Sequence, residues 1–545
     1  MAKVSTIKSV ISQSSKRITT SAKNLQTADT IGVLAKESYY KNLGEKAQSD
    51  AKPEGWDNAK TYESIPGPKP LPLVGNLWRY MPGIGEYYNV PLKEFWEKLH
   101  RTYGDTVRFG GIPGKKELVA LFQPSDFEKV HRNEGPWPVR YGLPSFVYYR
   151  NHIRQDVFQG VGGVLTVQGE EWFKFRSIVN KILMQPRTAQ MYVSSMDEVA
   201  NDLIDNIRFF SKTNENHQMP ADFQNELYKW TLESMGVIAY NKRLGVLDRN
   251  SKKDSDGQKL ISFSIQMFEL MYKLDVLPSM WPYISTPSWR KYIKILDFLT
   301  QMNTKYVDEC LSKMDPDANI PEHEQSVLER LSKIDRKVAL TMATDMMIAG
   351  IDTTGRTMGA ALYFLSKNPD KQEILREELK QHMPNKNSPV TKEMLMYSPY
   401  LKAVVREATR LSPISIGQLR TTIKDLVLGG YQIPKGTDVV TINLLLSHDE
   451  KYFKDAKMFK PERWLRDTED EYSSKNVNPF ASLPFGFGPR SCIGKRLANL
   501  ELDVGLSKVI RNFQLSWPHP DAKFGMKLLY GIEDPLKLKV EEIQG

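Results

Sequence analysis

The feature that most constrains this chain is a glycine-rich segment around Cys492, one of its two cysteines. Residues 485–494 read Phe-Gly-Phe-Gly-Pro-Arg-Ser-Cys-Ile-Gly and precede residues 495–510, whose apolar spacing is helical. A cysteine at a helix N-terminus meets the positive end of the helix dipole, which favours the thiolate over the thiol. Arg490 adds a positive charge, and the flanking glycines let a large flat group approach the sulfur closely.

The pattern F-x-x-G-x-R-x-C-x-G fixes five positions of this segment. At roughly one chance in twenty for each, a chain of 545 residues matches it by accident on the order of 10⁻⁴ times. A metal held by one thiolate needs other ligands, and a haem brings its own nitrogens. The alternative is a buried structural cysteine, the usual state of a lone cysteine. The specificity of the pattern favours a metal ligand.

The rest of the chain has mainly helical patterning. Apolar residues recur at spacings of three and four in residues 91–102, 197–210, 222–240, 288–313, 336–366, 369–382 and 399–411. Short β-like runs at residues 106–109, 118–122 and 438–444 are separated by Gly and Pro turns. Ten Trp, 24 Tyr and 22 Phe supply core material, and no repeat or internal linker divides the chain. We therefore expect one large, mostly α domain with small β-sheets.

Composition excludes several classes of protein. Two cysteines are too few for a disulfide framework or for the Cys₄ and Cys₂His₂ sites of structural zinc. The longest uncharged stretches, residues 276–289 and 476–489, have 14 residues each. A membrane-spanning helix needs about 20, so a polytopic membrane protein is excluded.

The N-terminal region differs from the rest. Residues 1–28 contain no Asp or Glu, but five Lys or Arg and ten Ser or Thr, with apolar residues on one helical face. This pattern is typical of an organelle transit peptide, and the alternative is a disordered basic tail. A polar segment, residues 29–64, leads to four prolines within residues 66–72, which predict a stiff, extended lead-in or an ordinary spacer. We expect the folded domain to cover residues 65–545.

Residues 485–494 resemble the cysteine loop of the cytochrome P450 superfamily, the haem-thiolate monooxygenases. The resemblance extends from about residue 66 to the C-terminus. It implies the cytochrome P450 fold, with a single haem domain and a haem b whose iron is bound by Cys492. Phe485 and Gly488 are the loop residues that would lie against this cofactor.

A second family motif lies on the helix before Pro413. Residues 407–410, Glu-Ala-Thr-Arg, match the family's E-x-x-R, whose two charged side chains share one helix face. Residues 373–376 fit the same short pattern, and there we expect a solvated ion pair. The resemblance implies that Glu407, Arg410 and Arg463 form a buried network that holds the cysteine loop in register.

The third motif interrupts the helical stretch 336–366. Gly350 and the pair Thr353-Thr354 are poor helix formers, which suggests a functional bulge at this point. The resemblance is to the family's oxygen-binding helix, where an acid and an alcohol, here Asp352 and Thr353, relay protons. The alternative is a kink in which threonine hydroxyls bond to carbonyls of their own helix.

Three arginines are candidates for binding the haem propionates, since a guanidinium can bind a carboxylate bidentately. Trp172 and Arg176 fit the family's W-x-x-x-R. Arg420 follows the helix of residues 399–411, and Arg490 lies in the cysteine loop. Each could instead be an ordinary surface arginine.

The transit-like N-terminus and the absence of an anchor helix indicate the animal mitochondrial class, and an insect member in particular. We expect no fused reductase, so electrons would come from a ferredoxin fed by an NADPH-dependent reductase. Basic positions matching the docking face of that class are Lys402, Arg406, Lys495 and Arg496. The alternative is a set of ordinary solvated helix charges. The net charge of +10 is then explained by import and docking rather than by nucleic-acid binding.

The expected substrate is lipophilic, because the stretches that would line the pocket are apolar. They are residues 142–164, 260–287, 342–349, 412–419 and 529–532. Xenobiotic detoxification is preferred over steroid or ecdysteroid hydroxylation, and an O₂-independent isomerase is a further alternative. Residues 274–289 are core or a membrane-surface contact. We expect a peripheral location on the matrix side of the inner mitochondrial membrane.

Overall fold

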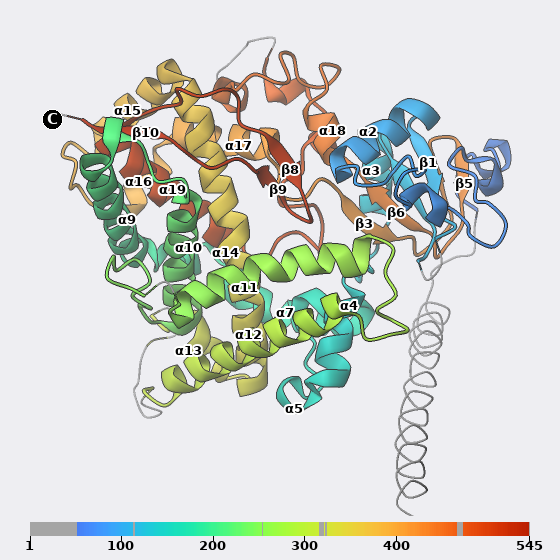
Figure 1. The fold of residues 1–545 in the computed structure, drawn as a ribbon, viewed down its shortest axis with the longest axis horizontal. Helices are drawn as coiled ribbons and strands as arrows, with labels where there is room; N and C mark the ends of the chain where they lie inside the picture. The colour runs from blue at the N-terminus through green and yellow to red at the C-terminus, as the bar shows by residue number, and fades with distance from the viewer. Residues whose placement is uncertain are drawn as a thin grey trace, which may run out of the picture.

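The computed structural model describes residues 52–543, except 113–114, 253, 315–320, 322–323 and 466–471. The predicted transit peptide, residues 1–28, and the polar segment up to residue 51 lie outside this range. Figure 1 shows a large body of helices with the four-stranded sheet at one side of it, and the last strand, Lys539–Glu542, on the opposite side. The prediction of a mostly α protein with small sheets is confirmed.

The helices of the described chain are α2 (Leu92–Tyr103), α3 (Pro124–Arg132), α4 (Pro144–Tyr148), α5 (Gln155–Phe158), α6 (Gly163–Thr166), α7 (Gly169–Leu183), α8 (Pro186–Gln190), α9 (Val193–Thr213), α10 (Phe223–Tyr240), α11 (Asp256–Met271), α12 (Pro287–Leu311), α13 (Val327–Ser332), α14 (Arg336–Lys367), α15 (Pro369–His382), α16 (Lys392–Met396), α17 (Pro399–Leu411), α18 (Asn443–Ser447) and α19 (Lys495–Asn512). Within this part of the chain, no helix is both long and apolar enough to cross a bilayer.

The main sheet has four strands in the order β1-β2-β6-β3, namely β1 (Thr106–Phe109), β2 (Leu118–Leu121), β6 (Asp438–Thr441) and β3 (Gln418–Thr421). The β2 and β6 strands run parallel, and the other two pairings are antiparallel. Two-stranded sheets pair β4 (Leu426–Leu428) with β5 (Tyr431–Ile433), β7 (Phe513–Ser516) with β10 (Lys539–Glu542), and β8 (Phe524–Met526) with β9 (Tyr530–Ile532).

Helix α14 is the central element of the helical body. The Asp335 side chain caps its start by accepting from the Lys337 N–H at 2.7 Å. Most of its side chains are buried, in agreement with an apolar sequence that continues around the helix. It packs against α10, α12, α13 and α19, so the largest core cluster surrounds it.

The expected functional bulge near Gly350 is not present, since α14 is α-helical throughout. The glycines of this helix serve close packing instead. A Cβ atom at Gly350 would lie 2.6 Å from the Met235 sulfur, and one at Gly355 would lie 2.5 Å from the Tyr228 ring. Both neighbours belong to α10, so the two helices approach closely because small residues lie between them.

Most predicted elements match the observed ones within a few residues, but the stretch 438–444 does not. We expected one strand, whereas β6 ends at Thr441 and α18 begins at Asn443. The side chain of Asn443 donates to the Phe480 carbonyl at 3.0 Å, which anchors the turn between the two elements. A short apolar run such as residues 444–446 fits a buried helix as well as a strand, so periodicity could not decide.

Candidate active site

Cys492 lies in a tight loop that leads directly into α19. Its N–H donates to the Phe485 carbonyl at 2.8 Å, and the Ser491 N–H donates to the Gly488 carbonyl at 3.0 Å. Gly486 and Gly488 have φ angles of 70° and 69°, a left-handed conformation that favours glycine. The two glycines therefore let the chain fold back on itself and present the cysteine at the start of the helix.

The Cys492 side chain is solvent-accessible. Burial nevertheless raises the pKa of its thiol, so much protein surrounds it. Both observations fit a sulfur that opens into a recess inside the molecule. The N–H groups of Gly494 and Lys495 and the guanidinium groups of Arg176 and Arg140 act in the opposite direction and lower the pKa. These groups act in the direction that the sequence predicted for a cysteine at a helix N-terminus, but the effect of burial is larger.

Arginines surround this loop. Arg176, on α7, donates to the Ser491 carbonyl at 2.8 Å, while its buried Nε has no hydrogen-bond partner in the structure. Arg490 is held by protein oxygens, including the Pro138 carbonyl and the Gln168 side chain, both at 2.8 Å. Its guanidinium lies 3.7 Å from the ring centroid of buried Trp172, a cation–π contact.

Arg420, on β3, is buried and forms an ion pair with Glu134. A fourth arginine, Arg140, was not found from the sequence. The N–H of Thr421 donates to the Val139 carbonyl at 2.9 Å, which ties residue 140 to the strand that carries Arg420. Arg140 belongs to an extended segment without periodicity, so no sequence pattern distinguishes it.

The four arginines repel one another. Burial, together with the charges of Arg140, Arg420 and Arg176, lowers the pKa of Arg490 to about 8. Burial also lowers the pKa of Arg140 and of Arg176, each to about 10. Among the described residues, Glu134 is the carboxylate paired with this set. The surplus of buried positive charge fits an anionic group such as the thiolate and two propionates of a haem.

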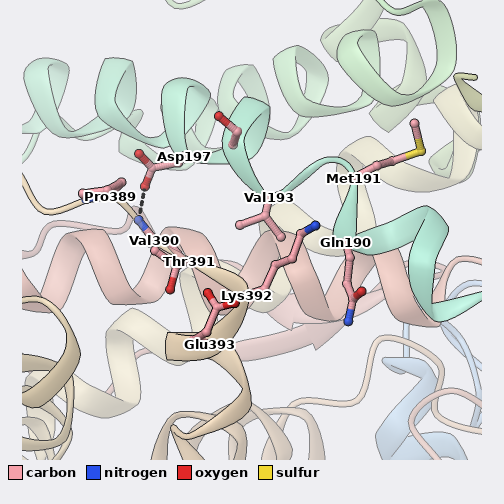
Figure 2. Close-up of a pocket in the computed structure, with 10 residues that line it drawn as sticks. Gln190, Met191, Val193, Asp197, Pro389, Val390, Thr391, Lys392 and Glu393 are labelled. Carbon is pink, nitrogen blue, oxygen red and sulfur yellow. Dashed lines mark hydrogen bonds between the residues drawn. The ribbon is translucent and has the colours of Figure 1, made fainter. Parts of the chain in front are cut away.

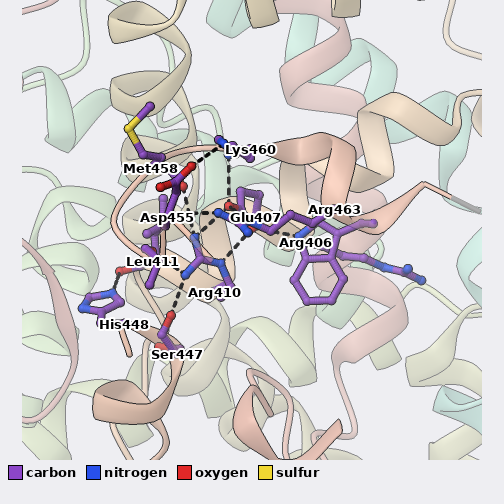
Figure 3. A network of polar contacts seen from close by, with 12 residues as sticks. Arg406, Glu407, Arg410, Leu411, Ser447, His448, Asp455, Met458, Lys460 and Arg463 are labelled. Atoms are coloured by element: carbon purple, nitrogen blue, oxygen red, sulfur yellow. Dashed lines mark hydrogen bonds and ion pairs between the residues drawn. The ribbon is translucent and has the colours of Figure 1, made fainter. Parts of the chain in front are cut away.

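Behind the loop, Glu407, Arg410 and Arg463 form the predicted buried network (Figure 3). Glu407 accepts from Arg410 at 2.7 and 2.9 Å and from Arg463 at 3.2 Å. The Lys460 N–H and the Trp464 ring N–H also donate to this carboxylate, at 3.0 and 2.8 Å. The two arginines also donate to backbone carbonyl groups within residues 447–458, so the network fixes α17 against that segment.

Asp352 and Thr353 are neighbours on α14 that contact different partners. Asp352 is buried and accepts from Arg356 Nε at 2.7 Å, and Tyr228 of α10 lies close enough to influence its carboxyl group. Burial raises the pKa of its carboxyl, and Arg356 and Tyr228 act against this shift. The Thr353 hydroxyl donates to the Ala349 carbonyl at 2.6 Å, which is the back-bonded geometry considered as an alternative for this motif.

The stretches predicted to line the substrate pocket come together around α14. Arg150 forms a fully buried ion pair with Asp345 at 2.6 Å, which joins residues 142–164 to this helix. The Tyr530 N–H donates to the Ile414 carbonyl at 2.9 Å, and β9 packs on α14. Ser145 donates to Asp275 at 2.6 Å and thus joins α4 to the π-helical turn Tyr272–Val276 that follows α11.

The four basic residues expected at a docking face are all exposed. Lys402 and Arg406 lie on α17, and Lys495 and Arg496 lie at the start of α19, which packs on α17. Asp503, a buried residue of α19, lies near the first pair. Burial raises its pKa to about 7 against the opposing effect of Lys402 and Arg406.

A separate pocket of about 360 Å³ lies between the start of α9 and residues 389–393 (Figure 2). Asp197 borders it and accepts from the Val390 N–H at 2.8 Å. None of the predicted site residues lines this pocket, so it is distinct from the cysteine loop.

Comparison with known proteins identifies the family of this chain. The family described as Cytochrome P450 matches residues 65–539. "Probable cytochrome P450 12a5, mitochondrial" from Drosophila melanogaster is 39% identical over 499 residues, which cover 90% of this chain and 92% of the relative. "Cytochrome P450 CYP12A2" from Musca domestica is 38% identical over 501 residues, covering 90% and 92%. "Cytochrome P450 12b1, mitochondrial" from Drosophila acanthoptera is 36% identical over 467 residues, covering 85% and 86%.

This family binds haem through a cysteine thiolate. The loop of Cys492 and the surplus of buried arginine around it agree with such a cofactor. The chain belongs to the cytochrome P450 family of haem-thiolate monooxygenases.

Proposed function

We propose that Cys492 is the axial ligand of a haem b and that the enzyme inserts one oxygen atom from O₂ into a lipophilic substrate. The observation that carries this proposal is the position of Cys492, just before α19, beside four arginines, of which Arg420 alone forms an ion pair with a carboxylate among the described residues. Bound haem supplies the activation of dioxygen, and an electron-rich thiolate favours cleavage of the O–O bond.

The residues around the cofactor would have separate roles. Arg176, Arg420 and Arg140 can bind the propionates, while Arg490, held by protein oxygens and by Trp172, would fix the loop. Phe485 accepts from the Cys492 N–H and Gly488 shapes the loop, so both would position the sulfur. The network of Glu407, Arg410 and Arg463 would hold the loop in register.

Asp352 and Thr353 would supply protons to the reacting oxygen. Asp352 is buried, whereas its partner Arg356 retains 21% of its side-chain exposure, so this ion pair connects the interior with solvent. The Thr353 hydroxyl would leave the Ala349 carbonyl to donate elsewhere, by rotation about its side-chain bond.

Electrons would come from a mitochondrial ferredoxin with its NADPH-dependent reductase. Exposed Lys402, Arg406, Lys495 and Arg496 support this proposal, because a basic surface attracts an acidic donor. Residues 1–28 would be the transit peptide, residues 29–64 a polar segment and residues 65–545 the haem domain.

We further propose a peripheral location on the matrix side of the inner mitochondrial membrane. Apolar side chains are exposed in two segments, at Leu73 and Ile84 in one and at Met280 and Ile284 in the other. Lys115 donates to the Leu274 carbonyl at 3.2 Å and to the Asp275 carbonyl at 2.8 Å, which ties the second segment to the β1–β2 connection. Exposed apolar and aromatic residues of this kind suit a membrane surface.

Xenobiotic oxidation is the substrate role that we favour over hydroxylation of a steroid or ecdysteroid. The residues around α14 are largely apolar and do not distinguish the two. An O₂-independent isomerase is less favoured, because the acid and alcohol at Asp352 and Thr353 would have no task in it.

The spectrum of the reduced, carbon monoxide-bound protein tests the thiolate. We expect the red-shifted Soret band of thiolate ligation in the wild type and its loss in Cys492→Ser. Cys310→Ser is the matched control, because Cys310 lies on α12, outside the cysteine loop, and should leave the band in place. A band that survives Cys492→Ser would overturn the assignment. Reconstitution with ferredoxin and reductase against a panel of lipophilic compounds then tests the reaction.

A further inference from the structure

Glu134 is an acidic residue that packs against the cysteine loop. It follows α3, is buried, and pairs with Arg420 through its Oε2 atom. The His131 Nδ1 atom lies 3.4 Å from the same oxygen. The second carboxylate oxygen, Oε1, is buried and has no hydrogen-bond partner in the structure. Burying a carboxylate with one unpaired oxygen costs folding free energy. Glu134 is therefore better explained by a role in the site than by local stability.

The unpaired oxygen faces the cysteine loop itself. A Cβ atom at Gly488 would lie 2.5 Å from Glu134 Oε1, so any other residue there would displace the carboxylate. The ring of His131 lies 6.0 Å from the ring of Phe487, in the same loop. The end of α3 and the cysteine loop are therefore packed around Glu134.

Glu134 balances the positive charges around the proposed haem. Arg140, Arg176, Arg420 and Arg490 contribute four positive charges that influence one another. The Cys492 thiolate and the two propionates of a haem supply three negative charges, and Glu134 supplies the fourth. Without Glu134 the surroundings of the iron would carry one surplus positive charge. Such a charge favours the reduced iron, because reduction adds an electron.

We propose that Glu134 is a positioning residue of the haem site, which orients Arg420 and whose negative charge lowers the reduction potential of the iron. This proposal rests on the proposed haem ligation by Cys492. The two are tested separately, since loss of thiolate ligation is read from the carbon monoxide spectrum and not from the potential.

The test compares two variants of the haem-loaded enzyme. Glu134→Gln keeps the size and one acceptor oxygen but removes the charge. We expect its reduction potential to rise by about 59 mV. At a fixed solution potential, this rise increases the ratio of reduced to oxidised iron tenfold. Glu134→Asp keeps the charge, but its shorter side chain places the carboxylate farther from Arg420. We expect a potential close to that of the wild type and a several-fold faster transfer of haem to apomyoglobin.

Glu226→Gln is the matched control, because Glu226 is also buried but pairs with Lys229 on α10. Its potential should equal that of the wild type. The proposal is overturned if Glu134→Gln has the wild-type potential, or if Glu134→Asp raises the potential as much as Glu134→Gln does. Should Glu134→Gln fail to retain haem, the potential of Glu134→Asp decides: a wild-type value supports the charge effect, and a raised value contradicts it.

Discussion

At the scale of single residues, the two Glu-x-x-Arg pairs of this chain have the same spacing and different surroundings. Glu407 and Arg410 are both fully buried, and Arg463 joins them. In the other pair, Glu373 has 54% of its side chain exposed, whereas Arg376 is buried and binds the Ile510 and Phe513 carbonyls. The expectation of a solvated ion pair there is thus right for the glutamate and wrong for the arginine.

This difference predicts unequal effects on stability. Glu407→Gln leaves Arg410 and Arg463 buried without a counter-charge, and we expect the free energy of unfolding to fall by about 3–5 kcal/mol. Glu373→Gln removes a solvent-exposed partner and should cost at most about 1 kcal/mol. Urea unfolding followed by circular dichroism measures both variants. Equal losses in the two would show that the Glu407 network has no special structural role.

The hydroxyl of Thr353 provides a second prediction at this scale. Thr353→Ala should keep the thiolate Soret band but divert reducing equivalents into hydrogen peroxide, because the proton donor is lost. We expect product formed per NADPH to fall by at least about tenfold. Thr357→Ala is the control, since Thr357 makes the same back-bond one turn later, to the Thr353 carbonyl at 2.9 Å. Tight coupling in Thr353→Ala would refute the proton-relay role.

At the scale of elements, the contact between α10 and α14 depends on glycines with unlike neighbours. At Gly355 an added Cβ meets the Tyr228 ring, which is flat, rigid and buried. At Gly350 the added atom meets the flexible end of Met235. The same chemical change should therefore have different consequences at two positions of one helix interface.

We predict that Gly355→Ala lowers the free energy of unfolding by about 1–3 kcal/mol, since overpacking exceeds the gain in helix propensity. Gly350→Ala should be nearly neutral, because Met235 can adopt another rotamer. Thermal unfolding of the two variants measures the contrast. A larger loss at Gly350 than at Gly355 would contradict this account of the interface.

Local pattern predicted some of these elements well and others poorly. The long helices and the cysteine loop were predictable because periodicity and glycine positions are properties of neighbouring residues. Arg140 and Glu134 were not, since they reach the site through the pairing of Val139 with Thr421 and through the end of α3. The environment of Asp352 also depends on distant parts of the chain, because Tyr228 comes close to it only where α10 packs on α14.

At the scale of the whole molecule, α19 connects the cysteine loop with the basic surface. Asp503 on this helix has a pKa raised to about 7, so its carboxyl is neutral below that pH and ionised above it. Ionisation offsets the charge of Lys402 and Arg406. We therefore predict that binding of an acidic ferredoxin weakens as pH rises through about 7, as measured by titration of the complex. Asp503→Asn should remove this step, and an unchanged pH dependence would exclude Asp503 as its source.

The basic surface itself gives the last prediction. Lys402 and Arg406 are exposed one turn apart on α17, which packs on α19. Since α19 begins just after Cys492, a donor bound at this surface lies close to the haem site. Lys402→Glu with Arg406→Glu should slow reduction by ferredoxin and lessen its dependence on ionic strength, because the attractive charge is lost. Stopped-flow reduction at several salt concentrations measures both effects. Lys212→Glu, an exposed lysine on α9 beside Glu542, is the control and should reduce at the wild-type rate. Wild-type kinetics across ionic strength in the double variant would rule out docking at this surface.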